Sequence, residues 1–190
     1  MRKLIFFMHT SLDGFVAGPK GEMNWIKVDE EMFDFVGTMT DKADAALYGR
    51  VTYDMMQSYW PTAGDQPDAS KHDKEHSAWY NSVSKVVLSK TMSEKGLVNT
   101  HVISDHLAEN INKLKKQDGK HILIFGSPGA SHSLLIEGLI DEFWLFVNPV
   151  LLGQGMPLFK GVTGTTQLKL AESKTFSSGV IALHYETTRN

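Results

Sequence analysis

The sequence predicts a three-layer α/β fold, in which helices cover both faces of a central, mixed and mostly parallel sheet that finishes as an antiparallel hairpin. Short apolar runs alternate with segments of helical periodicity up to residue 138, as in parallel sheets with crossover helices. After that point the chain is strand-like, and Ser177-Ser178-Gly179 supplies a turn signal between its last two strands. The length of 190 residues, with 42% hydrophobic and 22% charged residues, predicts one domain over residues 1–190.

The first expected strand covers residues 3–8, an apolar run that ends before the turn-forming pair Asp13-Gly14. A run without polar alternation is typical of a strand buried on both faces of a parallel sheet. Similar runs occupy residues 43–48, 85–88, 101–103 and 121–125. The antiparallel end of the sheet is expected from residues 142–150, 168–174 and 180–187.

Helical patterns separate these strands, at residues 29–39, 52–59, 71–83, 106–117 and 131–138. The first of them has one apolar stripe, made of Met32, Phe33, Val36 and Met39. Ser104-Asp105 supplies N-cap chemistry for the fourth helix, and Asp118-Gly119 ends it. The polar residues 61–74 are expected to form a long exposed loop.

Charge and composition argue against several functional classes. A net charge of -3 and a pI of about 6.2 lack the basic surplus that nucleic-acid binding usually shows. The absence of cysteine excludes disulfides, thiol catalysis and Cys-ligated metals. The apolar run from Leu4 to Met8 is too short for a signal-peptide core, and no run approaches the roughly 20 residues that span a bilayer. We therefore expect a cytoplasmic protein that binds neither nucleic acid nor membrane.

Three expected strand ends carry groups that favour an anion. One strand runs into Gly126-Ser127-Pro128-Gly129 and a helix, where glycines allow close backbone approach and the helix N-terminus attracts negative charge. Arg50 and Thr52 follow a second strand end at Gly49, and Ser89-Lys90 follows a third. Each feature alone also suits a tight turn or a capped surface helix. Together they predict a dinucleotide crevice, because open α/β sheets bind ligands outside the carboxyl ends of their strands. The GxGxxG fingerprint of an ordinary Rossmann domain is not present in this loop.

Longer motifs follow one another over nearly the whole chain. They are Ser11-x-Asp13-Gly14-Phe15-Val16-Ala17, Gly49-Arg50-x-Thr52-Tyr53, and a third stretch that runs from Gly138-Leu139-Ile140-Asp141-Glu142-Phe143 to Asn148-Pro149-Val150-Leu151-Leu152-Gly153-Gln154-Gly155-Met156-Pro157-Leu158-Phe159. These motifs resemble the dihydrofolate reductase superfamily, and most of all the C-terminal reductase domain of the bacterial bifunctional riboflavin-biosynthesis protein. The third stretch is the most specific. The family's paired glycines read here as Gly126-Ser127.

The resemblance implies a dihydrofolate reductase-like fold, an NADPH cofactor and a homodimer. By the same resemblance, the cofactor phosphates would contact Gly49, Arg50 and Thr52, and the adenosine 2'-phosphate would contact Ser89 and Lys90. The diphosphate would contact Gly126, Ser127 and Gly129. The nicotinamide would lie near Ala17 and Gly18. The apolar residues 143–147 suit a subunit interface as well as a core.

The residues that would handle substrate and proton are less constrained. Asp29 or Glu30 at the start of the first helix is the first candidate for a proton donor, although a solvated helix N-terminus explains both equally well. Trp25 could stack on a flat heterocycle and His9 lies at the end of the first strand, near the expected nicotinamide. A place in the core is the alternative for each.

We therefore expect an NADPH-dependent reductase of a small heterocycle, either a ribosylaminopyrimidine or a pterin. The alternative is a sensor that binds the dinucleotide without turnover. A third hypothesis is a metal-dependent hydrolase, because His72 and His76 lie one helical turn apart; against it, the pair is not part of an HExxH motif, and we expect no metal.

Overall fold

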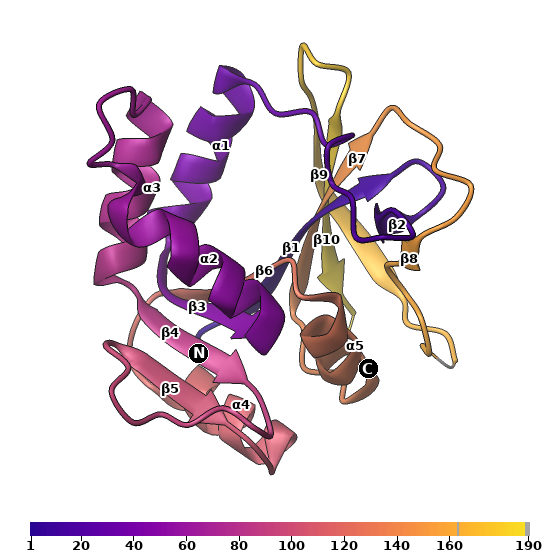
Figure 1. Cartoon of the computed structure of the whole chain (residues 1–190). Coiled ribbons are helices and arrows are strands. Elements are labelled where there is room, and N and C mark those ends of the chain that lie inside the picture. Colours follow the sequence, from indigo (N-terminus) through magenta and orange to yellow (C-terminus); the bar gives the residue numbers. More distant parts are fainter. Residues whose placement is uncertain (163, 189–190) are drawn as a thin grey trace.

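The computed structural model describes residues 1–162 and 164–188 (Figure 1). Within these residues, eight strands form one sheet in the order β5-β4-β3-β6-β1-β7-β10-β9. Their bounds are β1 Leu4–Ser11, β3 Ala43–Gly49, β4 Ser84–Leu88, β5 Thr100–Ile103, β6 His121–Phe125, β7 Glu142–Asn148, β9 Leu168–Thr175 and β10 Ile181–Thr187. The pairs from β5 to β7 are parallel, and β10 pairs antiparallel with β7 and β9. The predicted mixed sheet with its antiparallel end is confirmed.

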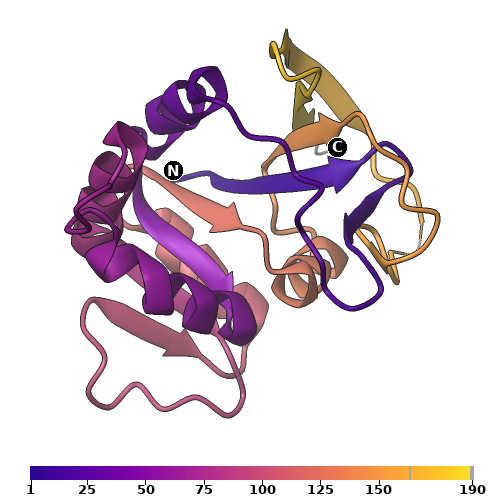
Figure 2. The ribbon, with the colours of Figure 1, turned by 45° about the horizontal axis from the view of Figure 1, so that its top comes forward.

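Alternate residues of the central strands enter two separate cores. Ile5 and Phe7 of β1 join a core with side chains of α1 (Glu30–Thr40), α2 (Arg50–Ala63) and α3 (Lys71–Ser82). Leu4 and Phe6 join the other core, under α4 (Leu107–Lys116) and α5 (Pro128–Ile136). The helices therefore lie on both faces of the sheet (Figure 2), which explains why these strands are apolar at every position.

The first helix begins as the sequence predicts. Asp29 caps α1, because its carboxylate accepts a hydrogen bond from the backbone N–H of Met32 at 2.8 Å. Met32, Val36 and Met39 are buried, whereas Phe33 turns away from the core and stacks on His72 of α3.

Several boundaries differ from prediction. Helix α2 continues through Pro61 to Ala63, so the expected loop at 61–74 shrinks to residues 64–70, and α3 starts at a capping box of Ser70 and Asp73. The N-cap of α4 is His106 with a φ of 44° and no side-chain cap bond, so the N-cap prediction for Ser104-Asp105 was wrong. Helix α5 begins at Pro128 rather than 131, because proline fits the first helical turn.

A second sheet of two short strands was not predicted. It pairs β2 (Phe15–Ala17) with β8 (Met156–Pro157), which are far apart in sequence. The predicted turn at Ser177-Ser178-Gly179 does join β9 and β10, with Gly179 at a φ of 83°. Over the residues that the structure describes, every helix is too short or too polar to cross a bilayer.

Candidate active site at the carboxyl ends of the parallel strands

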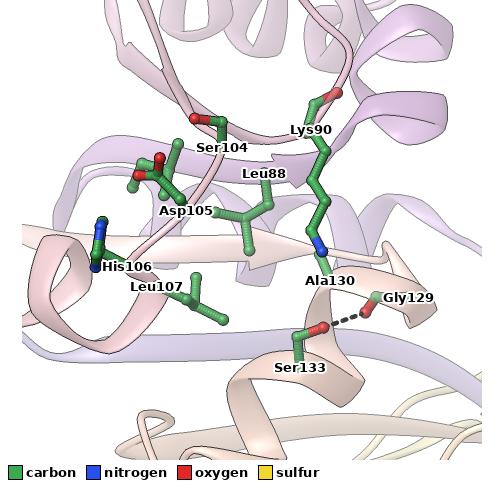
Figure 3. Close-up of a pocket in the computed structure, with 11 residues that line it drawn as sticks. Leu88, Lys90, Ser104, Asp105, His106, Leu107, Gly129, Ala130 and Ser133 are labelled. Atoms are coloured by element: carbon green, nitrogen blue, oxygen red, sulfur yellow. Dashed lines mark hydrogen bonds between the residues drawn. The ribbon is translucent and has the colours of Figure 1, made fainter.

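Two cavities lie at the carboxyl-terminal edge of the parallel sheet, and the first turn of α5 separates them. The first has a volume of about 510 Å³ and lies where β4 and β5 end (Figure 3). Its wall includes Ser89 and Lys90 after β4 and Gly129 and Ala130 of α5. In Figure 3 the side chain of Lys90 points across the cavity toward Ala130. An exposed cation thus lies close to the positive end of a helix, which makes this cavity attractive to an anion.

The second cavity, of about 340 Å³, is apolar. Gly126, Ser127 and Pro128 at the start of α5 form one side of it, so the same turn borders both cavities. The other lining residues come from β1, β2, the segment between β2 and α1, α2, β6 and β8. They are Phe7, Met8, His9, Val16, Ala17, Gly21, Met23, Ile26, Val51, Thr52, Met55, Met56, Phe125 and Met156. We call this space the methionine cavity.

A hydrogen bond between Gly49 and Ser127 holds the turn between the cavities. The backbone N–H of Gly49 donates a hydrogen bond to Ser127 Oγ at 2.8 Å, and this bond ties the end of β3 to the end of β6. Gly126 and Ser127 both have positive φ, 58° and 56°. Ser131 Oγ donates to the carbonyls of both residues, at 3.1 and 3.0 Å. These three hydrogen bonds hold the turn in place at the start of α5, where the first backbone N–H groups have no partner within the helix.

The arginine and serine of the predicted phosphate site already have partners within the chain. Arg50 Nη1 donates to Thr91 Oγ1 at 2.9 Å and Arg50 Nε lies 3.6 Å from Asp54, so its guanidinium links the start of α2 to the loop after β4. Ser89 Oγ accepts from the backbone N–H of Met92 at 3.1 Å. Thr52 lines the methionine cavity.

The loop after β1 is anchored against the loop that precedes β8. Asp13 accepts hydrogen bonds from the backbone N–H groups of Gly153 and Leu152, at 2.7 and 3.2 Å, and from Ser11 Oγ at 2.6 Å. The bond from Ser11 is the main reason that the pKa of Asp13 is lowered. A Cβ on Gly155 would overlap the carbonyl oxygen of Ala17. Ala17 lines the methionine cavity, and Gly18 follows it in the same loop.

His9 belongs to the methionine cavity as a neutral ring. Burial lowers its pKa to about 4, so the imidazole carries no charge near neutral pH. The buried Asn148 lies beside it, with Nδ2 at 3.4 Å from His9 Nδ1. Asn148 Oδ1 also accepts from the backbone N–H of Lys27 at 2.9 Å. This amide therefore fixes the segment that carries Met23 and Ile26 over the cavity.

Asp29, Glu30 and Trp25 lie elsewhere. Asp29 and Glu30 line a different depression, beside α3, and neither borders the methionine cavity. Asp29 accepts from Met32 and, at 3.3 Å, from the hydroxyl of Ser177, and the bond from Met32 is the main cause of its lowered pKa. Trp25 is half-buried and donates from Nε1 to the carbonyl of Glu22 at 3.0 Å. The structure thus does not bring the three to the cavities.

His72 and His76 pack among aromatic rings. His72 stacks on Phe33 with centroids 3.8 Å apart, and His76 lies 4.1 Å from the ring of Trp60. Burial lowers the pKa of His76 to about 3. Within residues 1–162 and 164–188, no three His, Asp or Glu side chains are grouped to hold a metal ion. The placement of this pair gives no support to the hydrolase hypothesis.

The sequence analysis did not predict that the methionine side chains of this cavity form part of a site. Val51, Thr52, Met55 and Met56 line the cavity at the spacing of one face of α2. That spacing was visible in the sequence, but methionines at helical spacing are also the mark of a core-facing helix. The cavity needed the loop after β1 and strand β8 to complete it.

Comparisons with known proteins agree with this architecture. Residues 2–182 match the family model described as the RibD C-terminal domain. The chain is 37% identical over 187 residues to the uncharacterized protein YyaP of Bacillus subtilis (strain 168), covering 97% of this chain and 94% of that protein. A solved protein from Shewanella sp. PV-4 assigned to riboflavin biosynthesis superposes with a TM-score of 0.74 at 26% identity, over 98% of this chain and 99% of that one.

The fold is also that of dihydrofolate reductase. The enzyme from Enterococcus faecalis, solved in complex with NADP(H), superposes with a TM-score of 0.63 at 12% identity, over 98% of this chain and 97% of that one. The matches thus confirm the family and the fold that the motifs suggested. This chain belongs to the RibD C-terminal domain family and has the dihydrofolate reductase-like fold.

Proposed function

We propose that this protein is an NADPH-dependent reductase of a small planar substrate. The observation that carries the proposal is the position of the first turn of α5 between two cavities of different character. A nicotinamide dinucleotide has the matching order of parts: a phosphorylated adenosine, a diphosphate and a flat nicotinamide. The cavity beside Lys90 suits the first part, the α5 turn the second and the methionine cavity the third.

The residues present fit such a cofactor. The glycine at 129 has open space where a Cβ would stand, so a phosphate could approach the backbone there. Lys90 supplies positive charge at the adenosine side. The cofactor supplies the hydride when bound, and the chain's part is to orient the reacting groups and to exclude water.

The first test is a titration of the protein with NADPH and with NADH, followed by nicotinamide fluorescence. Lys90→Gln should weaken NADPH about tenfold and NADH much less, since one charge-assisted contact to the extra phosphate contributes roughly 1.4 kcal/mol. Lys95→Gln is the matched control, because Lys95 is also exposed in the loop after β4 but does not line the cavity. Equal weakening of both cofactors in Lys90→Gln would place the 2'-phosphate elsewhere.

Turnover is tested separately, by adding dihydrofolate or a ribosylaminopyrimidine and following the absorbance of the reduced nicotinamide. Oxidation that depends on an acceptor supports a reductase. Cofactor binding without oxidation by any acceptor would favour the sensor alternative. The sensor alternative is supported by the position of Asp29 and Glu30 outside the methionine cavity. Among the described residues, the wall of this cavity therefore contains no carboxylic acid.

A further inference from the structure

The methionine cavity is unusually rich in one side chain. Five of the chain's nine methionines line it: Met8, Met23, Met55, Met56 and Met156. They come from β1, the segment between β2 and α1, α2 and β8, so the tertiary fold and not one local pattern assembles them. Among the described residues that line the cavity, none is Lys, Arg, Asp or Glu.

This lining selects against an anionic ligand. A phosphate or carboxylate placed against thioethers and aromatic rings would lose its hydration without gaining a partner, which is strongly unfavourable. Thioethers are polarizable and pack well against flat π-systems, and their flexible side chains adapt to different outlines. The cavity therefore favours a flat, uncharged molecule over a phosphoribosyl compound or a glutamate-bearing pterin.

The polar side chains in the wall are those of His9, Thr52 and Ser127, and none of them is an acid. Asn148 lies behind the wall, beside His9. Asn148 Nδ2 donates to the carbonyls of Phe146 and Thr10 at 3.1 and 3.3 Å, which fixes the orientation of the amide. His9 Nδ1 lies 3.4 Å from this amide nitrogen, and the neutral imidazole has one N–H donor and one acceptor nitrogen. With its pKa lowered to about 4, His9 is suited to hydrogen-bond a carbonyl oxygen but not to serve as a charged acid.

We propose that the methionine cavity also binds, beside the nicotinamide, an uncharged, conjugated carbonyl acceptor of the quinone class, with His9 as hydrogen-bond donor to its oxygen. The inference rests on the reductase function proposed above and names its substrate class. The quinone would gain a hydride, with its two electrons, from the reduced nicotinamide, and one proton from water. One quinone, one NADPH and one proton then give one hydroquinone and one NADP⁺. No acid from the protein is required, because the negative charge that develops on the oxygen is delocalised over the ring.

Binding is measured without turnover, through the reactivity of the methionines. Met23, Met55 and Met156 are each 45% exposed, so dilute hydrogen peroxide should oxidise them in the free protein. The probe is 2-methyl-1,4-naphthoquinone, added to the protein alone and to the protein loaded with NADP⁺, and oxidation is read by peptide mass spectrometry. At ten times its Kd the probe should slow oxidation of these three residues about tenfold by mass action. Met1 is 83% exposed and outside the cavity, so its rate should not change.

Two comparisons make the assay specific. The anionic 1,4-naphthoquinone-2-sulfonate has the same ring system and should protect far less. Met55→Lys places a cation in the wall and should raise affinity for the sulfonate by roughly fivefold, the size of a partly exposed ion pair. Thr62→Lys is the control on the last turn of the same helix, since Thr62 is exposed and does not line the cavity. The chain has no cysteine, so thiol adducts with the quinone do not arise.

The outcomes separate this inference from the reductase proposal. Protection by the neutral quinone, with NADPH binding and quinone-dependent oxidation, supports both. Equal or better protection by the sulfonate, or no protection by either probe while NADPH binds normally, overturns the quinone inference and leaves the cofactor assignment standing. Protection without any NADPH binding overturns the reductase proposal, and with it the role of the quinone as an electron acceptor.

Discussion

Ser127 combines a costly backbone conformation with a hydrogen bond that offsets it. A φ of 56° is in the left-handed region, which costs a residue with a Cβ about 1 kcal/mol more than glycine. Its hydroxyl accepts the N–H of Gly49, a bond that typically contributes about 1 kcal/mol. Ser127 is thus less favourable in this backbone conformation than glycine would be, but its hydroxyl links two strand ends.

This balance predicts different results for two substitutions. Ser127→Ala keeps the strained backbone and leaves the Gly49 N–H without its acceptor, so it should lower the free energy of unfolding by roughly 1–2 kcal/mol. Ser127→Gly loses the same bond but removes the strain, and its effect should be close to zero. Urea unfolding measures both, with Ser133→Ala on the exposed face of α5 as a near-neutral control. Equal losses in the two Ser127 variants would show that the strain is negligible.

At the scale of elements, the small sheet of β2 and β8 forms one side of the methionine cavity. Val16 and Ala17 of β2 and Met156 of β8 line the cavity, and both strands are short. Pairing of so few residues is weak by itself. The backbone bonds to Asp13 and the close approach of Gly155 to Ala17 hold this sheet in place.

Gly155→Ala should therefore disrupt the small sheet. The added Cβ would overlap the Ala17 carbonyl, and the φ of 154° disfavours a side chain, so a loss above roughly 2 kcal/mol in stability is expected. Gly161→Ala is the control, because Gly161 has a φ of 75° but open space around its Cβ position. It should cost only the backbone strain, about 1 kcal/mol. If the two variants unfold at the same urea concentration, the close approach of Gly155 to Ala17 does not affect stability.

At the scale of the whole molecule, two histidines make the folding stability sensitive to acid. His9 and His76 have pKa values of about 4 and 3, mainly because burial disfavours their charged forms. In the unfolded chain both would take up a proton near pH 6.5. As pH falls below 6.5, the unfolded state binds protons that the folded state does not, so folding stability decreases. This loss should continue until about pH 4 for His9 and about pH 3 for His76.

The corresponding measurement is urea unfolding at several pH values below neutrality. His76→Phe should flatten the decline, because it removes one of the groups that protonate on unfolding while keeping an aromatic ring beside Trp60. His101→Gln is the control, since His101 is exposed. An unchanged slope in His76→Phe would mean that His76 protonates equally well in the folded protein.

Association is also a property of the whole molecule, and the homodimer stays a prediction. Phe143 and Phe146 of β7 are buried within one chain, so part of that strand serves the core. Leu168 and Leu170 of the outermost strand β9 and Ile181 of β10 remain exposed. Sedimentation of the purified protein would measure its oligomeric state directly.

The sequence by itself determined the layered architecture, the parallel centre, the turn at Ser177-Ser178-Gly179 and the family. These follow from local signals, because a strand buried on both faces must be apolar throughout and a tight turn needs particular residues. The family followed from motifs that can be recognised directly along the sequence. The three strand ends were also visible, since parallel strands bring their carboxyl ends to one edge.

Only the tertiary structure decided which of the candidate side chains meet. Asp29 is drawn into the N-cap of α1 and the hairpin at Ser177, 148 positions away, while Asn148 reaches back to His9 and Lys27. The methionine cavity likewise needs side chains from β1, α2 and β8. The contacts of Asp29 with Ser177 and of Asn148 with His9 and Lys27 join residues more than a hundred positions apart, so local propensity does not predict them. They arise from packing two cores against one sheet, and it is this packing that places a neutral histidine and five methionines around one space.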